Sequence, residues 1–234
     1  MGIKALLKNC KNMKPKIYIL QYGQLEQLKN PTLNNAIGLH VLTGLIVYKK
    51  DNKDKGIIID PGLINDFNNY KTQLSDYNLN LSDITHILCT HFHQDHIQSL
   101  AKFSEGTHIF HYGTSSLLGS HEYQGKEYEN YIEIPEISFK LFDSAHTKKD
   151  TIYIIDSSNE GKVAFMGDMI FADINTIDIE TQRNLDKGAS VNPKRRLNLA
   201  KKFFEENNDI QGFYLGHGSE KVSRENIKEY FKKF

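Results

Sequence analysis

The sequence has few cysteines and no excess of charge of either sign. Only Cys10 and Cys89 occur among the 234 residues, and they lie far apart. Two isolated cysteines exclude a disulfide framework and a CxxC metal site, so we expect a reducing compartment and a cytoplasmic location. Basic and acidic residues number 29 each, so the formal net charge is zero. That balance argues against avid nonspecific binding to nucleic acid, which depends on many phosphate contacts.

Long apolar runs, linkers and repeats are also missing. No apolar stretch approaches the ~20 residues needed to span a bilayer, so no membrane partner is expected. The basic start of the chain lacks the apolar segment of a secretory signal. A length of 234 residues with 39% apolar residues predicts one globular domain over 1–234, with an irregular terminus at 1–15. The sequence carries no indication of the oligomeric state.

Strand-like segments alternate with a few helix-like segments along the chain. Strand signals fall at 16–22, 39–49, 56–60, 84–89, 107–111, 137–142, 151–156, 162–166 and 211–215. Helical spacing or capping signals occur at 66–77, 96–103, 193–206 and 223–233. Residues 113–131 and 168–193 are expected to be irregular, and the sequence leaves open whether 113–131 and 170–193 act as lids. This order in two similar halves predicts layered α/β packing.

The segment Thr90–His96, Thr-His-Phe-His-Gln-Asp-His, concentrates side chains that bind metals. His91 and His93 are two residues apart, so in an extended segment they point the same way. Asp95 and His96 follow where the chain turns into the next helix, and they can face the same cavity from another angle. Neutral imidazoles and a carboxylate suit zinc and similar divalent ions.

Three more residues of the ligand type follow strands further along the chain. His146 comes after the strand at 137–142, Asp168 lies in Met-Gly-Asp, and His217 lies in Leu-Gly-His-Gly. Glycine or small residues stand beside each of them and allow a close approach of the backbone. Each alone is readable as an ordinary structural residue. Together with the histidine cluster, they predict one metal centre.

The order HxHxDH, then His, Asp and His, resembles the metallo-β-lactamase superfamily. The resemblance runs from Lys16 to about His217 and includes Ile-Ile-Ile-Asp-Pro-Gly at 57–62. It implies a four-layer αβ/βα sandwich, in which two mixed β-sheets carry helices on their outer faces. The site would lie at one edge, on the loops that follow the strands, and the chain would be a metal-dependent hydrolase.

The resemblance also implies a role for each ligand. One divalent ion would be held by His91, His93 and His146, the other by Asp95, His96 and His217, with Asp168 bridging them. Asp60 would orient the ligand loop through hydrogen bonds. Two ions ~3.5–4 Å apart would activate a shared water for attack on the substrate. Asp95 would pass a proton to the leaving group, so Asp95 and Asp168 are the expected catalytic residues. Zinc is the first choice, with iron or manganese as alternatives.

The substrate is less constrained than the metal centre. An ester, thioester or lactone of a small molecule is the first choice, because most compact members of this superfamily act on small molecules. Phosphodiester or nuclease chemistry is the alternative, and a non-catalytic metal-binding scaffold is a third hypothesis. Phe171 stands where lactonases usually place a tyrosine, which weakens the lactonase interpretation. Lys148, Lys149 and Arg195 either face an anionic substrate or form a solvated charged face.

Overall fold

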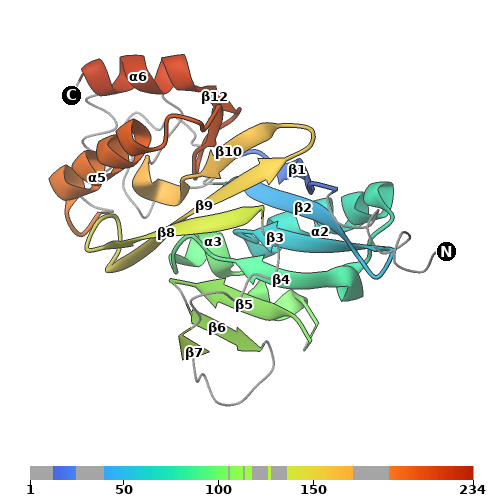
Figure 1. Ribbon diagram of the computed structural model, residues 1–234. Coiled ribbons are helices and arrows are strands. Elements are labelled where there is room, and N and C mark those ends of the chain that lie inside the picture. Colours follow the sequence, from blue (N-terminus) through green and yellow to red (C-terminus); the bar gives the residue numbers. More distant parts are fainter. Residues whose placement is uncertain are drawn as a thin grey trace.

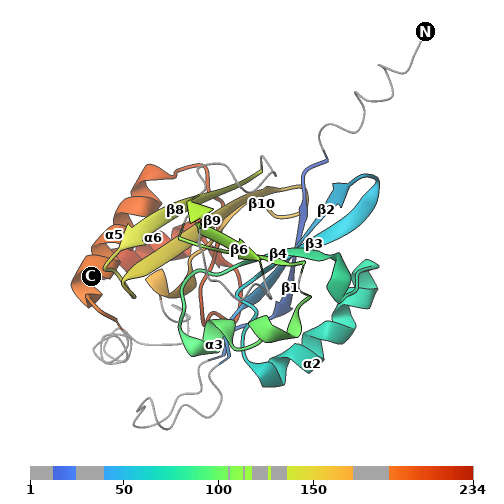
Figure 2. The ribbon, with the colours of Figure 1, turned by 90° about the horizontal axis from the view of Figure 1, so that it is seen from below.

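The computed structural model describes residues 13–24, 40–104, 106–112, 114–117, 126–127, 136–170 and 190–233. Two β-sheets lie face to face in this part of the chain, and helices cover the outer face of each sheet (Figure 1). The view from below separates the helices α5 and α6 on one side from α2 on the other (Figure 2). This is the four-layer α/β arrangement that the sequence predicts.

In the part of the chain that the structure describes, the first sheet has seven strands, which lie side by side in their order along the chain. The pairs β3–β4 and β4–β5 are parallel, and the other pairs are antiparallel. Helix α2 (Ile64–Gln73) lies in the crossover from β3 to β4. The strands are β1 (Lys16–Gln21), β2 (Thr43–Lys50), β3 (Lys53–Ile59), β4 (Ile84–Leu88), β5 (His108–His111), β6 (Thr114–Leu117) and β7 (Lys126–Glu127).

Among the described residues, the second sheet has five strands in the order β12-β11-β10-β9-β8. The pair β10–β11 is parallel and the other described pairs are antiparallel, and α5 (Pro193–Glu206) lies between β10 and β11 in the chain. Helix α6 (Arg224–Lys232) follows β12, and the Ser223 side chain caps its N-terminus by accepting a hydrogen bond from the backbone N–H of Asn226. The strands are β8 (Ile137–Asp143), β9 (Lys149–Ser157), β10 (Gly161–Phe165), β11 (Gly212–Tyr214) and β12 (Val222–Ser223).

The three interfaces between layers follow from the alternation of side chains along the strands. On β9, Ile152 and Ile154 join the buried cluster under α5 and α6. Their neighbours Tyr153 and Ile155 join a second cluster, which lies between the two sheets. Successive residues of a strand point to opposite faces, so a strand buried on both sides reads as a continuous apolar run.

The same rule governs β3, where Ile57 and Ile59 face the other sheet and Ile58 faces α2. All three side chains are at most 1% exposed. Burial of an isoleucine side chain contributes about 1.5–3 kcal/mol, so the run Ile-Ile-Ile anchors two interfaces at once. The strand ends at Asp60, which is thereby placed at the edge of the sheet.

The structure corrects two of the predicted segments. The helix expected at 96–103 is instead a single turn, α3 (Gln94–Ile97), followed by a 3₁₀ turn at Leu100–Lys102. The segment 113–131, expected to be irregular, contributes β6 and β7 to the first sheet. The remainder of 113–131, including Tyr123, Tyr128 and Tyr131, lies outside the described residues, as do 171–189. Within the described part, no helix is long and apolar enough to cross a membrane.

Candidate metal centre

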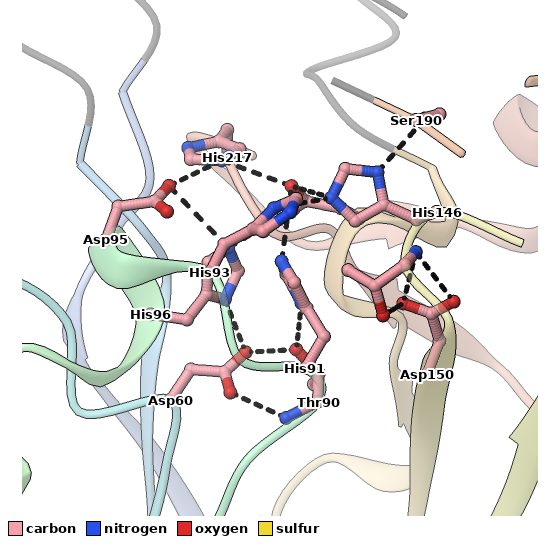
Figure 3. A network of polar contacts seen from close by, with 12 residues as sticks. Asp60, Thr90, His91, His93, Asp95, His96, His146, Asp150, Ser190 and His217 are labelled. Atoms are coloured by element: carbon pink, nitrogen blue, oxygen red, sulfur yellow. Dashed lines mark hydrogen bonds and ion pairs between the residues drawn. The ribbon is translucent and has the colours of Figure 1, made fainter. Parts of the chain in front are cut away.

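The seven predicted ligands converge at one edge of the two sheets. Figure 3 labels six of them, and Asp168 is the seventh. Four ligands follow the carboxyl end of β4, and His146 sits in the turn between β8 and β9. The other two follow the ends of the parallel strands β10 and β11. The chain thus brings residues from both halves of the molecule into one cluster. The predicted ligands in the cluster are His91, His93, Asp95, His96, His146, Asp168 and His217.

The ligand atoms form two groups, each with its atoms within 4.8 Å of one another. The first group is His91, His93, His146 and Asp168, and the second is Asp95, His96 and His217. In the first group, Nδ1 of His93 lies 2.9 Å from Nε2 of His146. Such convergence of imidazole nitrogens is the arrangement that a divalent cation requires.

The carboxylate of Asp168 lies between the two groups. Its Oδ2 atom is 3.2 Å from Nε2 of His146 and 3.6 Å from Nε2 of His217. Its Oδ1 atom is 3.4 Å from Nε2 of His96. The Asp168 side chain is 2% exposed. A buried carboxylate with one histidine group on each side fits a ligand shared by two cations.

Unsatisfied polar atoms provide a separate test of that fit. Within the described part of the chain, Nε2 of His91, Nε2 of His96 and Oδ1 of Asp168 are buried and make no hydrogen bond. A buried polar atom without a partner costs about 1–3 kcal/mol. Bound cations satisfy all three atoms at once, so the residues present fit a metal centre.

In four of the predicted ligand histidines, Nε2 faces the centre and Nδ1 contacts a hydrogen-bond partner outside it. Nδ1 of His91 contacts the Thr90 hydroxyl at 3.0 Å, and Nδ1 of His96 contacts Asp60 at 2.9 Å. Nδ1 of His217 lies 2.9 Å from the carbonyl of His40, and Nδ1 of His146 lies 3.0 Å from the Ser190 hydroxyl. Outer partners of this kind fix the tautomer that directs Nε2 inward.

Asp60 organises the ligand loop from beneath, as the sequence led us to expect. Its carboxylate accepts hydrogen bonds from the Thr90 backbone N–H at 2.8 Å and from the Thr90 hydroxyl at 2.7 Å. The same carboxylate faces His96, so one side chain orients both ends of the ligand loop (Figure 3). Asp60 has φ of 46°, in the left-handed region that non-glycine residues rarely occupy. We interpret this conformation as part of how the carboxylate reaches the loop.

Close backbone packing sets the position of Asp168. Gly167 has φ of 49°, and a Cβ atom there would collide with the Thr90 side chain. A Cβ atom on Gly216 would collide with Asp168 itself. The small residues that flank Asp168 and His217 in the sequence are therefore required by contact between the two ligand loops.

The electrostatics of the centre are strongly coupled. Burial lowers the pKa of His91 well below its ordinary value, and the neighbouring His96 lowers it further. Burial also lowers the pKa of His96, but the carboxylates of Asp168 and Asp60 outweigh burial and raise it well above normal. Burial raises the pKa of Asp168, yet His217, His96 and His146 together lower it well below normal. Asp168 is therefore ionised at neutral pH, which is the form that binds cations.

Asp95 differs from Asp168 in exposure. Its side chain is 19% exposed, and its Oδ2 atom lies 3.4 Å from Nε2 of His217 and 3.8 Å from Nε2 of His96. Asp95 thus lies at the accessible side of the centre.

The sequence missed several residues that hold the ligands. Ser190 supports His146, and the backbone N–H and hydroxyl of Thr147 donate to the buried carboxylate of Asp150 in the ligand turn. Arg196 is fully buried, although it stands in a charged run. Its spacing from Ala200 and Phe203 matches one face of α5, so helical periodicity gave a signal for its burial.

The predicted basic residues are engaged locally. The ammonium of Lys149 lies 4.4 Å from the centre of the Tyr112 ring, and Nε of Arg195 donates to the carbonyl of Asp143. Both residues are exposed, as in a solvated charged face.

Comparison with known proteins places this geometry in a family. The profile of the metallo-beta-lactamase superfamily matches residues 37–217. No curated protein matches the chain in sequence. A Thermotoga maritima protein assigned as a metallo-beta-lactamase shares the fold, with 18% identity, a TM-score of 0.59, and coverage of 90% of this chain and 99% of that one.

Two other solved structures share the fold. A variant of AiiA from B. thuringiensis, with N-decanoyl-L-homoserine bound at its active site, has 16% identity and a TM-score of 0.55, covering 88% of this chain and 94% of its own. The chemotaxis sensor ODP, solved as a peroxy diiron species, has 15% identity and a TM-score of 0.58, covering 95% of this chain and 91% of its own. At these identities the likeness concerns the fold alone, whereas the family match spans most of the chain. The chain belongs to the metallo-beta-lactamase superfamily, and the predicted class, a metal-dependent hydrolase family, is confirmed.

Proposed function

We propose that the chain is a dinuclear metal-dependent hydrolase that cleaves an ester, thioester or lactone of a small molecule. The observation that carries the proposal is the position of Asp168. Its buried carboxylate lies within 3.6 Å of histidine nitrogens from both ligand groups. A structural ion pair would need one such partner, whereas a ligand shared by two cations needs partners on both sides.

The ligands divide between the two cations along the two groups. His91, His93 and His146 would hold one cation, Asp95, His96 and His217 would hold the other, and Asp168 would contact both. Two divalent cations held by these residues would supply Lewis acidity and would lower the pKa of a water in the centre toward neutrality. The contacts of Asp60, Thr90, Ser190 and the His40 carbonyl keep the imidazoles oriented without further rearrangement.

Asp95 is the residue that we propose moves the proton. It is the more exposed of the two carboxylates in the centre, so a substrate and a water can reach it. The Oδ2 atom would accept the proton of the attacking water and return it to the leaving group. Asp168 is too buried for that exchange, so its proposed role is to hold the cations in place.

Acyl substrates are favoured over phosphodiesters on the fold comparison. The AiiA structure holds N-decanoyl-L-homoserine at its active site. A small carbonyl compound is therefore the substrate class we propose for this chain, and no nucleic-acid partner is required.

Zinc is the cation that we propose, because imidazole nitrogens with few carboxylates suit it. Iron and manganese accept the same ligands, so availability in the cell also matters. The ODP structure shows that this fold also carries two iron ions in another protein. We retain the cytoplasm as the proposed location, on the ground that the sequence holds two isolated cysteines.

A substrate panel tests the proposal. The full-length chain is stripped of metal, reloaded separately with Zn²⁺, Fe²⁺ or Mn²⁺, and assayed with an acyl homoserine lactone, an acyl thioester, p-nitrophenyl acetate and bis(p-nitrophenyl) phosphate. Asp168→Ala serves as the control in each assay. We expect turnover of at least one acyl substrate, with loss of that turnover in Asp168→Ala.

Turnover restricted to the phosphodiester would replace acyl chemistry with phosphodiester cleavage. A loaded chain that turns over nothing, with or without Asp168, would favour the metal-binding scaffold. Activity that survives unchanged in Asp168→Ala would overturn the assignment of the site.

A further inference from the structure

Arg196 is a cation inside an apolar layer. It lies on α5, and its side chain is fully buried together with its helix neighbours Ala200 and Phe203. Burial of a charge is costly unless strong hydrogen bonds hold it. A buried arginine beside a candidate metal centre therefore calls for an account of what it holds.

The guanidinium holds the turn that carries Asp168. Its Nη1 atom donates to the backbone carbonyl of Asp168 at 2.7 Å and to that of Met169 at 3.1 Å. The turn is packed from the other side as well, because Gly167 lies against Thr90. Asp168 thus sits in a turn fixed between the HxHxDH loop and α5.

The residues just before α5 contact the loop that carries His146. The backbone N–H of Val191 donates to the carbonyl of His146 at 2.9 Å, and that of Asn192 donates to Ala145 at 3.1 Å. The Ser190 hydroxyl contacts Nδ1 of the same histidine (Figure 3). Residues 190–196 therefore contact two ligand loops, and Arg196 supplies the contact to the loop of Asp168.

We propose that Arg196 is a positioning residue that fixes the Asp168 carboxylate between the two cation sites. The inference rests on the proposed function, because it assigns Arg196 a role in that same centre. Arg196 acts through the backbone of Asp168, whose carbonyl accepts a hydrogen bond from the guanidinium. The planar guanidinium spans two neighbouring carbonyls from one nitrogen, and a lysine ammonium lacks that fixed geometry.

The test compares Arg196→Met and Arg196→Lys with a matched control, Arg224→Met. Arg224, the first residue of α6, also donates to backbone carbonyls, those of Phe204 and Asn207. These carbonyls lie at the C-terminal end of α5, whereas Arg196 lies in its first turn. Each full-length variant is titrated with Zn²⁺ against a competing chelator, and its melting temperature is recorded without metal. The kcat and KM are then measured on the substrate found for the wild-type chain.

We expect Arg196→Met to weaken binding of the more loosely held cation by about 10–100-fold, as for other residues that orient ligands. The kcat should fall while KM changes little, and Arg196→Lys should restore part of both. Arg224→Met should lower the melting temperature and leave cation affinity unchanged. If Arg196→Met does not fold, Arg196→Lys carries the test, with a loss of cation affinity that Arg224→Met does not share.

Cation affinity equal to wild type in both Arg196 variants would overturn the inference while leaving the proposed function in place. Equal losses of cation affinity in the Arg196 and Arg224 variants would overturn it in the same way. A wild-type chain that binds no cation would overturn the proposed function, and the role of Arg196 with it.

Discussion

Two clusters of histidines lie near strand β4, one beyond its carboxyl end and one within the sheet, and their surroundings differ. The metal centre follows its carboxyl end, whereas His86 lies within the strand and pairs with His108 of β5. The rings of the pair stack at 5.5 Å. Burial lowers the pKa of His86 to about 4, with His108 as a second cause, and burial likewise lowers the pKa of His91. Burial and neighbouring imidazoles are therefore common to both groups.

Both clusters also have a histidine whose Nδ1 contacts the hydroxyl of the preceding threonine. Nδ1 of His86 lies 2.9 Å from the hydroxyl of Thr85, just as Nδ1 of His91 lies 3.0 Å from the hydroxyl of Thr90. The difference is the carboxylate. Among the described residues, groups of three or more metal-binding side chains occur at the centre and do not include the His86–His108 pair. A buried carboxylate and a third converging side chain distinguish the candidate cation site from this half-buried histidine pair.

Substitution of one histidine from each cluster by alanine should give the largest contrast in bound metal and activity. His96→Ala removes a fully buried ligand, so we expect loss of one bound cation per chain and at least about 100-fold lower activity. His108→Ala should keep both cations and the activity. Metal analysis after dialysis, with an assay of each variant, measures both effects. Equal losses in the two variants would abolish the distinction between the groups.

Removal of the outer carboxylate should give the next largest effect. Asp60→Asn loses an acceptor that faces Thr90 and His96, so we expect cation affinity to fall by about 10–100-fold. Asp83→Asn is the matched control, because Asp83 pairs with Lys55 away from the centre. Chelator competition measures the affinity. An Asp60→Asn chain with wild-type affinity would contradict the role of Asp60.

The His86–His108 pair should affect the pH dependence of stability. The pKa of His86 is about 4 in the folded chain, and its ordinary value of 6.5 applies to the unfolded chain. As the pH falls, the unfolded chain therefore binds the proton first. Stability therefore falls as the pH drops from 6.5 to about 4. We expect His86→Gln to remove about 1–2 kcal/mol of that fall, because the ring is only partly buried. Urea unfolding of the metal-free chain at several pH values measures it, and an unchanged slope would refute the account.

The two threonines should give the smallest contrast. Thr90→Val removes a hydroxyl that contacts both Asp60 and His91, and we expect a loss of up to about tenfold in cation affinity from these two contacts. Thr85→Val makes the same change beside His86 and should leave cation affinity unchanged. Calorimetric titration of both variants gives the comparison. A larger effect from Thr85→Val would show that distance from the centre does not matter.

Much of the fold was predictable, because strands buried on both faces read as apolar runs and α5 has regular spacing. The helix expected at 96–103 failed, because apolar spacing does not reveal where the chain turns after a single helical turn. Strands β6 and β7 were missed, because they are short and contain many polar residues at the margin of a sheet. Local sequence patterns carry little information on such marginal pairing.

The clustering of these side chains was predictable because residues of the ligand type follow strands, and the structure brings all seven together. Their supports were harder to predict. The contact of Arg196 with Asp168 joins residues 28 positions apart, and the contact of His217 with the His40 carbonyl joins residues 177 positions apart. Backbone carbonyls and serine hydroxyls leave no pattern in a sequence, because any residue can supply a carbonyl.

The number of cations bound per chain is the sharpest test of a dinuclear centre. The metal-free, full-length chain is dialysed against buffered Zn²⁺, and bound metal is counted for the wild type, Asp168→Ala and His108→Ala. We expect two zinc ions per chain in the wild type and in His108→Ala, and fewer than two in Asp168→Ala. One ion or none in the wild type, or an unchanged count in Asp168→Ala, would contradict a dinuclear centre built around Asp168.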